Sequence, residues 1–211
     1  MSKSVVFICT SSSTFKGNPT GIWLEELAVP YYHFKECGYS IVIASVAGGP
    51  IPIDAASLGG DFFEESGKRF MHDAEAVGAL CHSVTIADAP TDSADAIFVP
   101  GGHGCCNPDF YNDATLISCI ESAIAAGKVV ALDCHGPTVL AQCKIDNNPI
   151  VSGIKVCGFT NSEEAAVGFT DSVDFLIETK FKEQGAEFER ADDWNGKAVA
   201  SKIGNGTLIT G

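Results

Sequence analysis

The chain has 211 residues, of which 45% are hydrophobic and 19% are charged. This composition excludes a disordered chain, a coiled coil and a collagen-like repeat, and the length suffices for one domain with a sizeable core. The 13 lysines and arginines against 27 aspartates and glutamates give a formal net charge of -14, which argues against binding to nucleic acid or to an anionic membrane. No apolar run approaches the roughly 20 residues that a membrane-spanning helix needs.

Short β-branched runs alternate with helical patterns along the chain, which is typical of a parallel sheet covered by helices. The expected elements, in chain order, are a strand at 4–9, a helix at 21–37 that Pro30 kinks or restarts, a strand at 39–45, a helix at 67–81, a strand at 96–100, a helix at 114–127, a strand at 128–133, a helix from about 136, a strand at 155–159, a helix at 172–185 and short strands at 198–200 and 207–210. We therefore predict a single α/β domain over residues 1–211, with a doubly wound, mostly parallel sheet and helices on both faces.

Ligands of doubly wound sheets bind beyond the carboxyl ends of the strands. In this chain that rule selects the loops at 10–20, 101–108 and 134–137. We expect the chemistry of the protein to be carried by these three loops.

Cys134 gives the strongest local signal, because a hydrophobic strand ends there and Gly136-Pro137 then begins a helix. Such a strand-to-helix turn is a nucleophile elbow, which lifts its side chain above the sheet. The helix N-terminus that follows favours a thiolate, the reactive form of cysteine. The alternative is a buried cysteine at a strand end that performs no chemistry.

The glycine-rich turn Gly101-Gly102-His103-Gly104 follows the preceding strand of the predicted sheet. Glycines let the backbone approach a ligand and present amide donors to a developing oxyanion. The turn is therefore a candidate half of an oxyanion hole that the amide of His135 completes; otherwise it is only a tight turn.

Two pairs of acids fall on predicted helices, at Glu25-Glu26 and Glu163-Glu164. Such pairs usually form a solvated helix face. Glu26 has apolar neighbours in sequence, and a carboxyl buried among them would have a raised pKa and could hold a proton near neutral pH.

Nine cysteines, an odd number, cannot all pair with one another, and no CxxC spacing suggests a zinc site. The N-terminus lacks the long apolar core of a signal peptide. We therefore expect free thiols in a reducing cytoplasm and no metal site.

Taken together, these motifs resemble the ThiJ/PfpI superfamily, and within it the glyoxalase III and heat-shock chaperone branch. The segments that carry the resemblance run in order over nearly the whole chain: Thr20 to Glu26 with Pro30-Tyr31-Tyr32, Pro100 to Gly104, Asp133 to Pro137, Gly158 to Asn161 through Glu164, and Leu208 to Gly211. The resemblance implies a flavodoxin-like fold, shared with class I glutamine amidotransferases.

The resemblance also implies a site. Cys134 would be the nucleophile, His135 and Glu164 would complete a triad, Glu26 would lie against the thiol, and the amides of Gly102 and His135 would form the oxyanion hole. The implied activity is glutathione-independent conversion of methylglyoxal, or a similar small dicarbonyl, to a 2-hydroxy acid such as D-lactate. No cofactor or metal is implied, and the expected assembly is a homodimer.

Two features depart from the pattern of this superfamily. Asp133 stands where an apolar or small residue usually precedes the nucleophile, and its charge would raise the pKa of the thiol unless the strand points it away. The sequence ends at Gly211, where relatives usually continue into a final helix, so we expect an effect on stability or on dimer contacts.

Three other functions compete with the glyoxalase interpretation. A holdase chaperone would use an exposed apolar patch and would not need Cys134. A redox sensor would oxidise Cys134 to a sulfinate beside Glu26. A cysteine peptidase ranks lower, because Trp23 and Tyr31-Tyr32 imply a narrow cleft.

Overall fold

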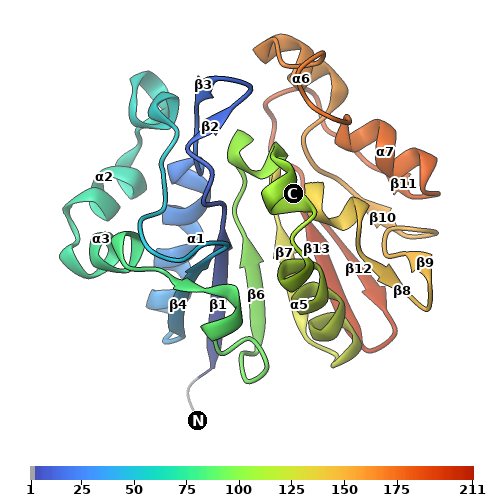
Figure 1. Cartoon of the computed structure of the whole chain (residues 1–211), viewed down its shortest axis with the longest axis horizontal. Helices are drawn as coiled ribbons and strands as arrows, with labels where there is room; N and C mark the ends of the chain where they lie inside the picture. The colour runs from blue at the N-terminus through green and yellow to red at the C-terminus, as the bar shows by residue number, and fades with distance from the viewer. Residues whose placement is uncertain (1–2) are drawn as a thin grey trace.

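A computed structural model describes residues 3–211, so residues 1 and 2 of the predicted domain lie outside the described part. Figure 1 shows a layered molecule in which helices flank a central sheet. The elements are β1 (Ser4–Cys9), β2 (Thr14–Phe15), β3 (Asn18–Pro19), α1 (Leu24–Glu36), β4 (Ser40–Ser45), α2 (Glu65–His72), α3 (Ala74–Cys81), β5 (Val84–Thr85), β6 (Ala96–Val99), α4 (Pro108–Tyr111), α5 (Ala114–Ala125), β7 (Val129–Leu132), β8 (Lys144–Ile145), β9 (Asn148–Pro149), β10 (Lys155–Val156), α6 (Asn161–Val167), α7 (Ile177–Glu183), β11 (Glu187–Phe188), β12 (Val199–Ile203) and β13 (Gly206–Thr210).

The central sheet confirms the predicted doubly wound fold. Its seven strands, counted within the described residues, lie in the order β12-β13-β7-β6-β1-β4-β5. All neighbours are parallel except β12 and β13, which form an antiparallel edge pair. The chain runs from β1 to β4 on one side and returns to β6 on the other, so the strand order reverses next to β1. The loops after β1, β6 and β7 meet at this switch point, where ligands of such sheets bind.

Alternation along the central strands explains why both faces of the sheet are covered. In β1, Val5 and Phe7 pack into a core cluster with helices α1 to α3, whereas Val6 and Ile8 pack into the cluster on the α5 face. Successive side chains of a strand point to opposite faces, so a continuous apolar run is what a strand buried on both sides requires.

Several predicted elements differ from the structure in extent. The helix expected at 67–81 is two helices, because Asp73 accepts hydrogen bonds from the amides of Glu75 and Ala76 and begins α3 as its N-cap. The helix expected from about 136 is a 3-10 helix, Gly136–Ala141. The strand expected at 155–159 is shorter and pairs with β11 outside the main sheet. Helix α1 continues through Pro30 without ending there.

Among residues 3–211, none of the helices combines the length and the hydropathy that crossing a bilayer would require.

Candidate active site

Cys134 lies in a strained turn directly after the central strand β7. Its φ of 53° is in the left-handed region that non-glycine residues rarely adopt. Three hydrogen bonds hold the turn: the Cys134 amide donates to the Gly211 carbonyl (2.9 Å), the Phe159 amide donates to the Cys134 carbonyl (3.0 Å), and the Gly136 amide donates to the Asp133 carbonyl (2.7 Å). Gly136 is required, because a Cβ there would overlap the carbonyl oxygen of Val99. The turn thus has the backbone of a nucleophile elbow.

A chain of hydrogen-bonding groups joins Cys134, His135 and Glu164. The Cys134 Sγ lies 3.3 Å from His135 Nδ1, and His135 Nε2 lies 2.9 Å from Glu164 Oε2. Burial and the nearby His103 lower the pKa of His135 to about 4, so the ring is neutral at pH 7. Because the ionised Glu164 can only accept, Nε2 carries the proton and Nδ1 presents its lone pair to the thiol.

His103 is a residue of this site that the sequence analysis did not assign a role. Its Nε2 lies 2.9 Å from the second carboxylate oxygen of Glu164. Its ring is tilted by 43° against that of His135, with the centroids 4.1 Å apart, and the Phe159 ring packs against His135 with the centroids 4.2 Å apart. The only signal in the sequence was its place in the glycine turn after β6. Although burial favours a neutral carboxyl, hydrogen bonds from both histidines lower the pKa of Glu164 to about 2.

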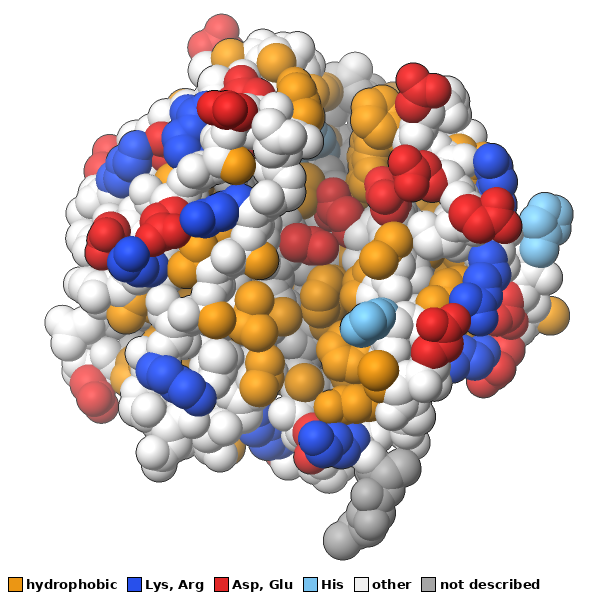
Figure 2. Space-filling model, turned by 180° about the vertical axis from the view of Figure 1, so that it is seen from behind, with side chains coloured by type: hydrophobic (Ala, Val, Ile, Leu, Met, Phe, Trp, Pro, Cys, Tyr) orange, Lys and Arg blue, Asp and Glu red, His pale blue; other side chains and the backbone are white. Residues whose placement is uncertain are grey.

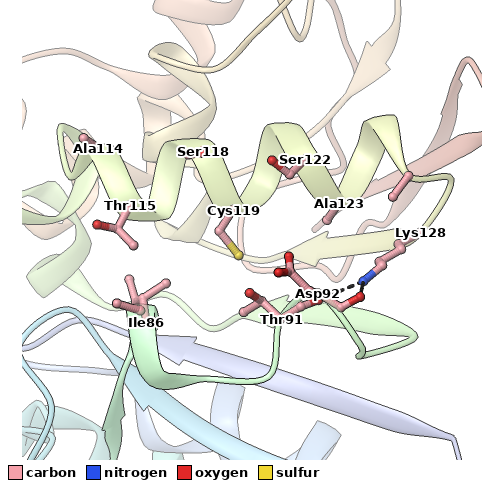
Figure 3. A pocket seen from close by; sticks show the side chains of 12 residues that line it. Ile86, Thr91, Asp92, Ala114, Thr115, Ser118, Cys119, Ser122, Ala123 and Lys128 are labelled. Atoms are coloured by element: carbon pink, nitrogen blue, oxygen red, sulfur yellow. Dashed lines mark hydrogen bonds between the residues drawn. The ribbon is translucent and has the colours of Figure 1, made fainter.

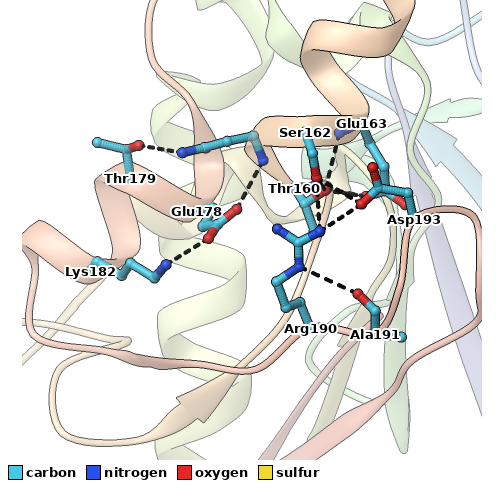
Figure 4. Close-up of polar contacts among 10 residues, drawn as sticks. Thr160, Ser162, Glu163, Glu178, Thr179, Lys182, Arg190, Ala191 and Asp193 are labelled. Atoms are coloured by element: carbon cyan, nitrogen blue, oxygen red, sulfur yellow. Dashed lines mark hydrogen bonds and ion pairs between the residues drawn. The ribbon is translucent and has the colours of Figure 1, made fainter.

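Helix α6 places Glu164 through a hydrogen-bonded first turn. Thr160 Oγ1 accepts from the Glu163 amide (3.2 Å), and Glu163 Oε2 accepts from the Thr160 amide (3.0 Å), which forms a capping box. Arg190, which follows β11 in the chain, donates a hydrogen bond to Ser162 Oγ at 2.9 Å (Figure 4). Glu163 therefore anchors the helix, and Glu164 is left to face the histidines. The expected first turn of a helix is present, but Glu164 is buried within it.

Two further carboxyls lie near the thiol, from Glu26 and Asp133. Burial raises the pKa of Glu26 to about 7, although hydrogen bonds from Cys134 and from the Gly101 amide oppose the shift. Burial, followed by the charge of Glu26, also raises the pKa of Asp133. Burial and both carboxyls together raise the pKa of the Cys134 thiol well above its usual range. The charge of Asp133 therefore still acts on the thiol, so β7 does not direct this carboxyl far enough from Cys134 to remove its effect.

The glycine turn after β6 packs tightly against the start of α1. Gly102 has a φ of 98°, and its amide lies against the Cys134 sulfur and lowers the pKa of that thiol, opposing the larger raising effects. The Gly101 carbonyl accepts from the Trp23 amide at 3.3 Å. A Cβ on Gly101 would lie 2.6 Å from the His135 nitrogen, so the two loops leave no space for a side chain. The amides of Gly102 and His135 are thus brought to the same end of the sheet as the thiol.

A second region of the molecule holds a cavity that is separate from these residues. It has a volume of about 590 Å³ and lies between α5 and the segment that includes Ile86 and Thr91 (Figure 3). Lys128 Nζ donates to the carbonyls of Thr91 and Asp92 at 2.8 and 2.6 Å, so its charge is engaged in holding that loop. None of the residues expected at the active site lines this cavity.

His103, His135 and Glu164 also form a group whose ligand atoms lie within 4.8 Å of one another. Both oxygens of Glu164 already accept hydrogen bonds from the two rings. A metal ion there would displace these bonds, so the arrangement fits an acid that orients histidines better than a metal centre.

Comparison with known proteins places the chain among relatives of similar length. Glyoxalase 3 of Candida albicans is 27% identical over 222 residues, which cover 100% of this chain and 92% of that protein. The solved structure of glyoxalase III from Candida albicans superposes with a TM-score of 0.85 at 25% identity, covering 99% of this chain and 90% of the other. Rapid Encystment Protein 24 KDa of Francisella tularensis gives a TM-score of 0.88 at 31% identity, covering 99% and 92%.

The model of the DJ-1/PfpI family matches residues 20–168, which include the glycine turn, the cysteine elbow and the first turn of α6. This match covers more than half of the chain. The chain belongs to the DJ-1/PfpI family.

Proposed function

We propose that the protein is a glutathione-independent glyoxalase that converts methylglyoxal, or a similar small dicarbonyl, to a 2-hydroxy acid. The observation that carries the proposal is the hydrogen-bonded chain from Cys134 through His135 to Glu164 on a strained elbow. The names of the fungal relatives, glyoxalase 3 and glyoxalase III, support the same activity.

In the proposed reaction, His135 Nδ1 takes the thiol proton as the Cys134 sulfur bonds to the aldehyde carbon. The carbonyl π electrons move to oxygen, which the amides of Gly102 and His135 stabilise and which is then protonated to give a hemithioacetal. A base moves the proton from C1 to C2 through an enediol, which leaves a thioester. Water hydrolyses the thioester and restores the thiol. The sum is dicarbonyl plus water to hydroxy acid, so no external oxidant or reductant is needed.

The decisive test is D-lactate formation from methylglyoxal, without glutathione, by the wild type and by Cys134→Ala. We expect product from the wild type and at least a 10³-fold loss in the variant, because the nucleophile is removed. Cys37→Ala is the matched control, since Cys37 is an exposed free cysteine, and it should keep full activity. A folded, reduced wild type that makes no lactate would overturn the proposal.

We further propose that the protein acts as a homodimer in the cytoplasm. All nine cysteines are free, which fits a reducing compartment. Val129, Ala131 and Ile209 are half-buried and belong to neither core cluster, so this part of the sheet leaves apolar surface for a second copy. Analytical ultracentrifugation should give about twice the 22.1 kDa chain mass. A monomer at micromolar concentration would contradict the dimer.

A further inference from the structure

Two carboxyl groups lie together near the nucleophile, and within residues 3–211 no lysine or arginine lines the cavity beside them. The Gly101 amide donates to Glu26 Oε2 at 2.8 Å and also faces the carboxyl of Asp133. Asp133 Oδ1 is shielded from solvent and has no hydrogen-bond partner among the described residues. Glu26 comes from α1 and Asp133 from the end of β7, so two separate elements place the acids together.

Such an arrangement cannot hold two full negative charges. Like charges in one poorly solvated site repel strongly, and one of the two carboxyls then keeps its proton at neutral pH. A buried acceptor without a donor also costs free energy, and a shared proton would supply the missing donor to Oδ1. At neutral pH the pair therefore holds one proton, whereas two isolated carboxyls would hold none.

The acids border a cavity that none of the three residues of the proposed triad lines. A cavity of about 430 Å³ reaches them and is lined by Glu25, Glu26, Val29, Pro30, His33, Phe98 and Asp133. Figure 2 shows acidic side chains in the hollow at the middle of this face. No lysine or arginine lines the cavity, so no fixed cation there neutralises the pair. The cavity gives protons a path to the pair that does not pass the thiol.

The other titratable groups around the pair do not change this conclusion. Glu25 and His33 line the cavity from α1, and the thiols of Cys9 and Cys134 face Asp133 from β1 and from the elbow. Burial, followed by the charge of Asp133, raises the pKa of the Cys9 thiol, so Cys9 stays neutral. Glu25 adds negative charge, which favours retention of the shared proton.

We propose that Asp133 is a positioning residue that shares one proton with Glu26, so that a protonated carboxyl faces the Cys134 sulfur in the resting protein. Asp133 acts through Glu26 and need not touch the substrate. The role of this proton in the reaction rests on the proposed glyoxalase function. In that reaction a proton donor next to the sulfur stabilises the Cys134 thiolate that leaves during thioester hydrolysis. The proton equilibrium itself does not depend on any substrate.

The test is the pH dependence of Cys134 alkylation by iodoacetamide, followed by mass spectrometry of the peptide that contains Cys134. Asp133→Asn keeps the shape of the side chain and removes its charge. Without Asp133 the Glu26 carboxyl no longer retains a proton and faces the sulfur as a carboxylate, so we expect the midpoint of alkylation to move up by about one pH unit, which is about tenfold slower alkylation at a fixed pH below the midpoint. Glu26→Gln keeps a neutral hydrogen-bond donor beside the sulfur, so its midpoint should not rise, and in the double variant the upward shift caused by Asp133→Asn should be abolished.

Asp146→Asn is the matched control, because Asp146 is exposed in the β8–β9 turn, where Asn tolerates its φ of 50°. Its midpoint should equal that of the wild type. An unchanged or lowered midpoint in a folded Asp133→Asn protein would overturn the inference. If that variant does not fold, 13C NMR titration of the wild-type carboxyl carbons decides: coupled, two-step curves for Asp133 and Glu26 support sharing, and independent single-step curves refute it.

Lactate formation is measured on the same samples to separate the two proposals. A raised midpoint without lactate production would retain the carboxyl pair and reject the glyoxalase function. Lactate production with an unshifted midpoint would retain the glyoxalase function and reject the carboxyl pair.

Discussion

Glu164→Gln should lower the kcat of lactate formation by about 10³-fold while the protein stays folded, which is comparable to the effect of removing the orienting acid of a catalytic triad. In the structure both oxygens of Glu164 accept hydrogen bonds, from His103 and from His135. Glutamine offers one oxygen and one amide group, so only one histidine can still donate to it. The other ring must present a lone pair, and the tautomer of His135 is no longer fixed.

Steady-state kinetics with methylglyoxal would measure this effect, with thermal unfolding recorded in parallel. Glu183→Gln serves as the control, because Glu183 is exposed on α7 and the same charge is lost far from the histidines. We expect its kcat to be unchanged. A Glu164→Gln protein that retains more than about a tenth of wild-type kcat would show that the carboxylate does not orient the base.

The loss should appear in kcat and much less in KM. Glu164 is buried behind the two imidazoles and acts on the reacting atoms only through His135. A rise in KM as large as the fall in kcat would indicate that the substrate pocket had collapsed, and the thermal unfolding measurement would reveal such a collapse.

The sequence was sufficient to predict the central strands of the sheet, because each is a short apolar run and the helices between them have an apolar spacing. It did not indicate the two-residue edge strand β5. The sequence was not sufficient where a single residue determines where a helix begins or ends. Asp73 divides a helical pattern into α2 and α3 by capping, and a regular spacing does not reveal such a break. The 3-10 geometry after Cys134 is imposed by packing, since all six residues of that segment are buried.

Local motifs indicated Cys134 and His135, whereas Glu26 and Glu164 were expected at the site only from the family resemblance. Cys134 and His135 lie in one turn, and the turn has a recognisable sequence. His103 and Glu164 are 61 residues apart, and no local pattern indicates that His103 and His135 share the Glu164 carboxylate. The position of Asp133 beside the nucleophile was visible in the sequence, but its convergence with Glu26 depends on how α1 packs against the end of β7.

Gly102→Ala should destabilise the protein by about 3 kcal/mol and lower activity by at least about 10²-fold. Gly102 has φ 98° and ψ 153°, a conformation that is essentially restricted to glycine. A Cβ there would overlap the Gly21 carbonyl oxygen and lie 2.6 Å from the Trp23 nitrogen. Because those contacts are backbone, they cannot move aside as a flexible side chain would.

Urea denaturation and lactate kinetics would measure the two effects, and Gly153→Ala is the control that separates their causes. Gly153 also has a positive φ, 73°, but a Cβ there would meet nothing within 4 Å. We expect that variant to lose only about 1 kcal/mol and no activity, since it carries the strain without the collision. If the two variants proved equally stable and active, the approach of the Gly102 loop to α1 would not be what holds the amide against the Cys134 sulfur. If Gly102→Ala alone lost both properties, the close backbone contact with Gly21 and Trp23 would be the feature that fixes the oxyanion-binding geometry.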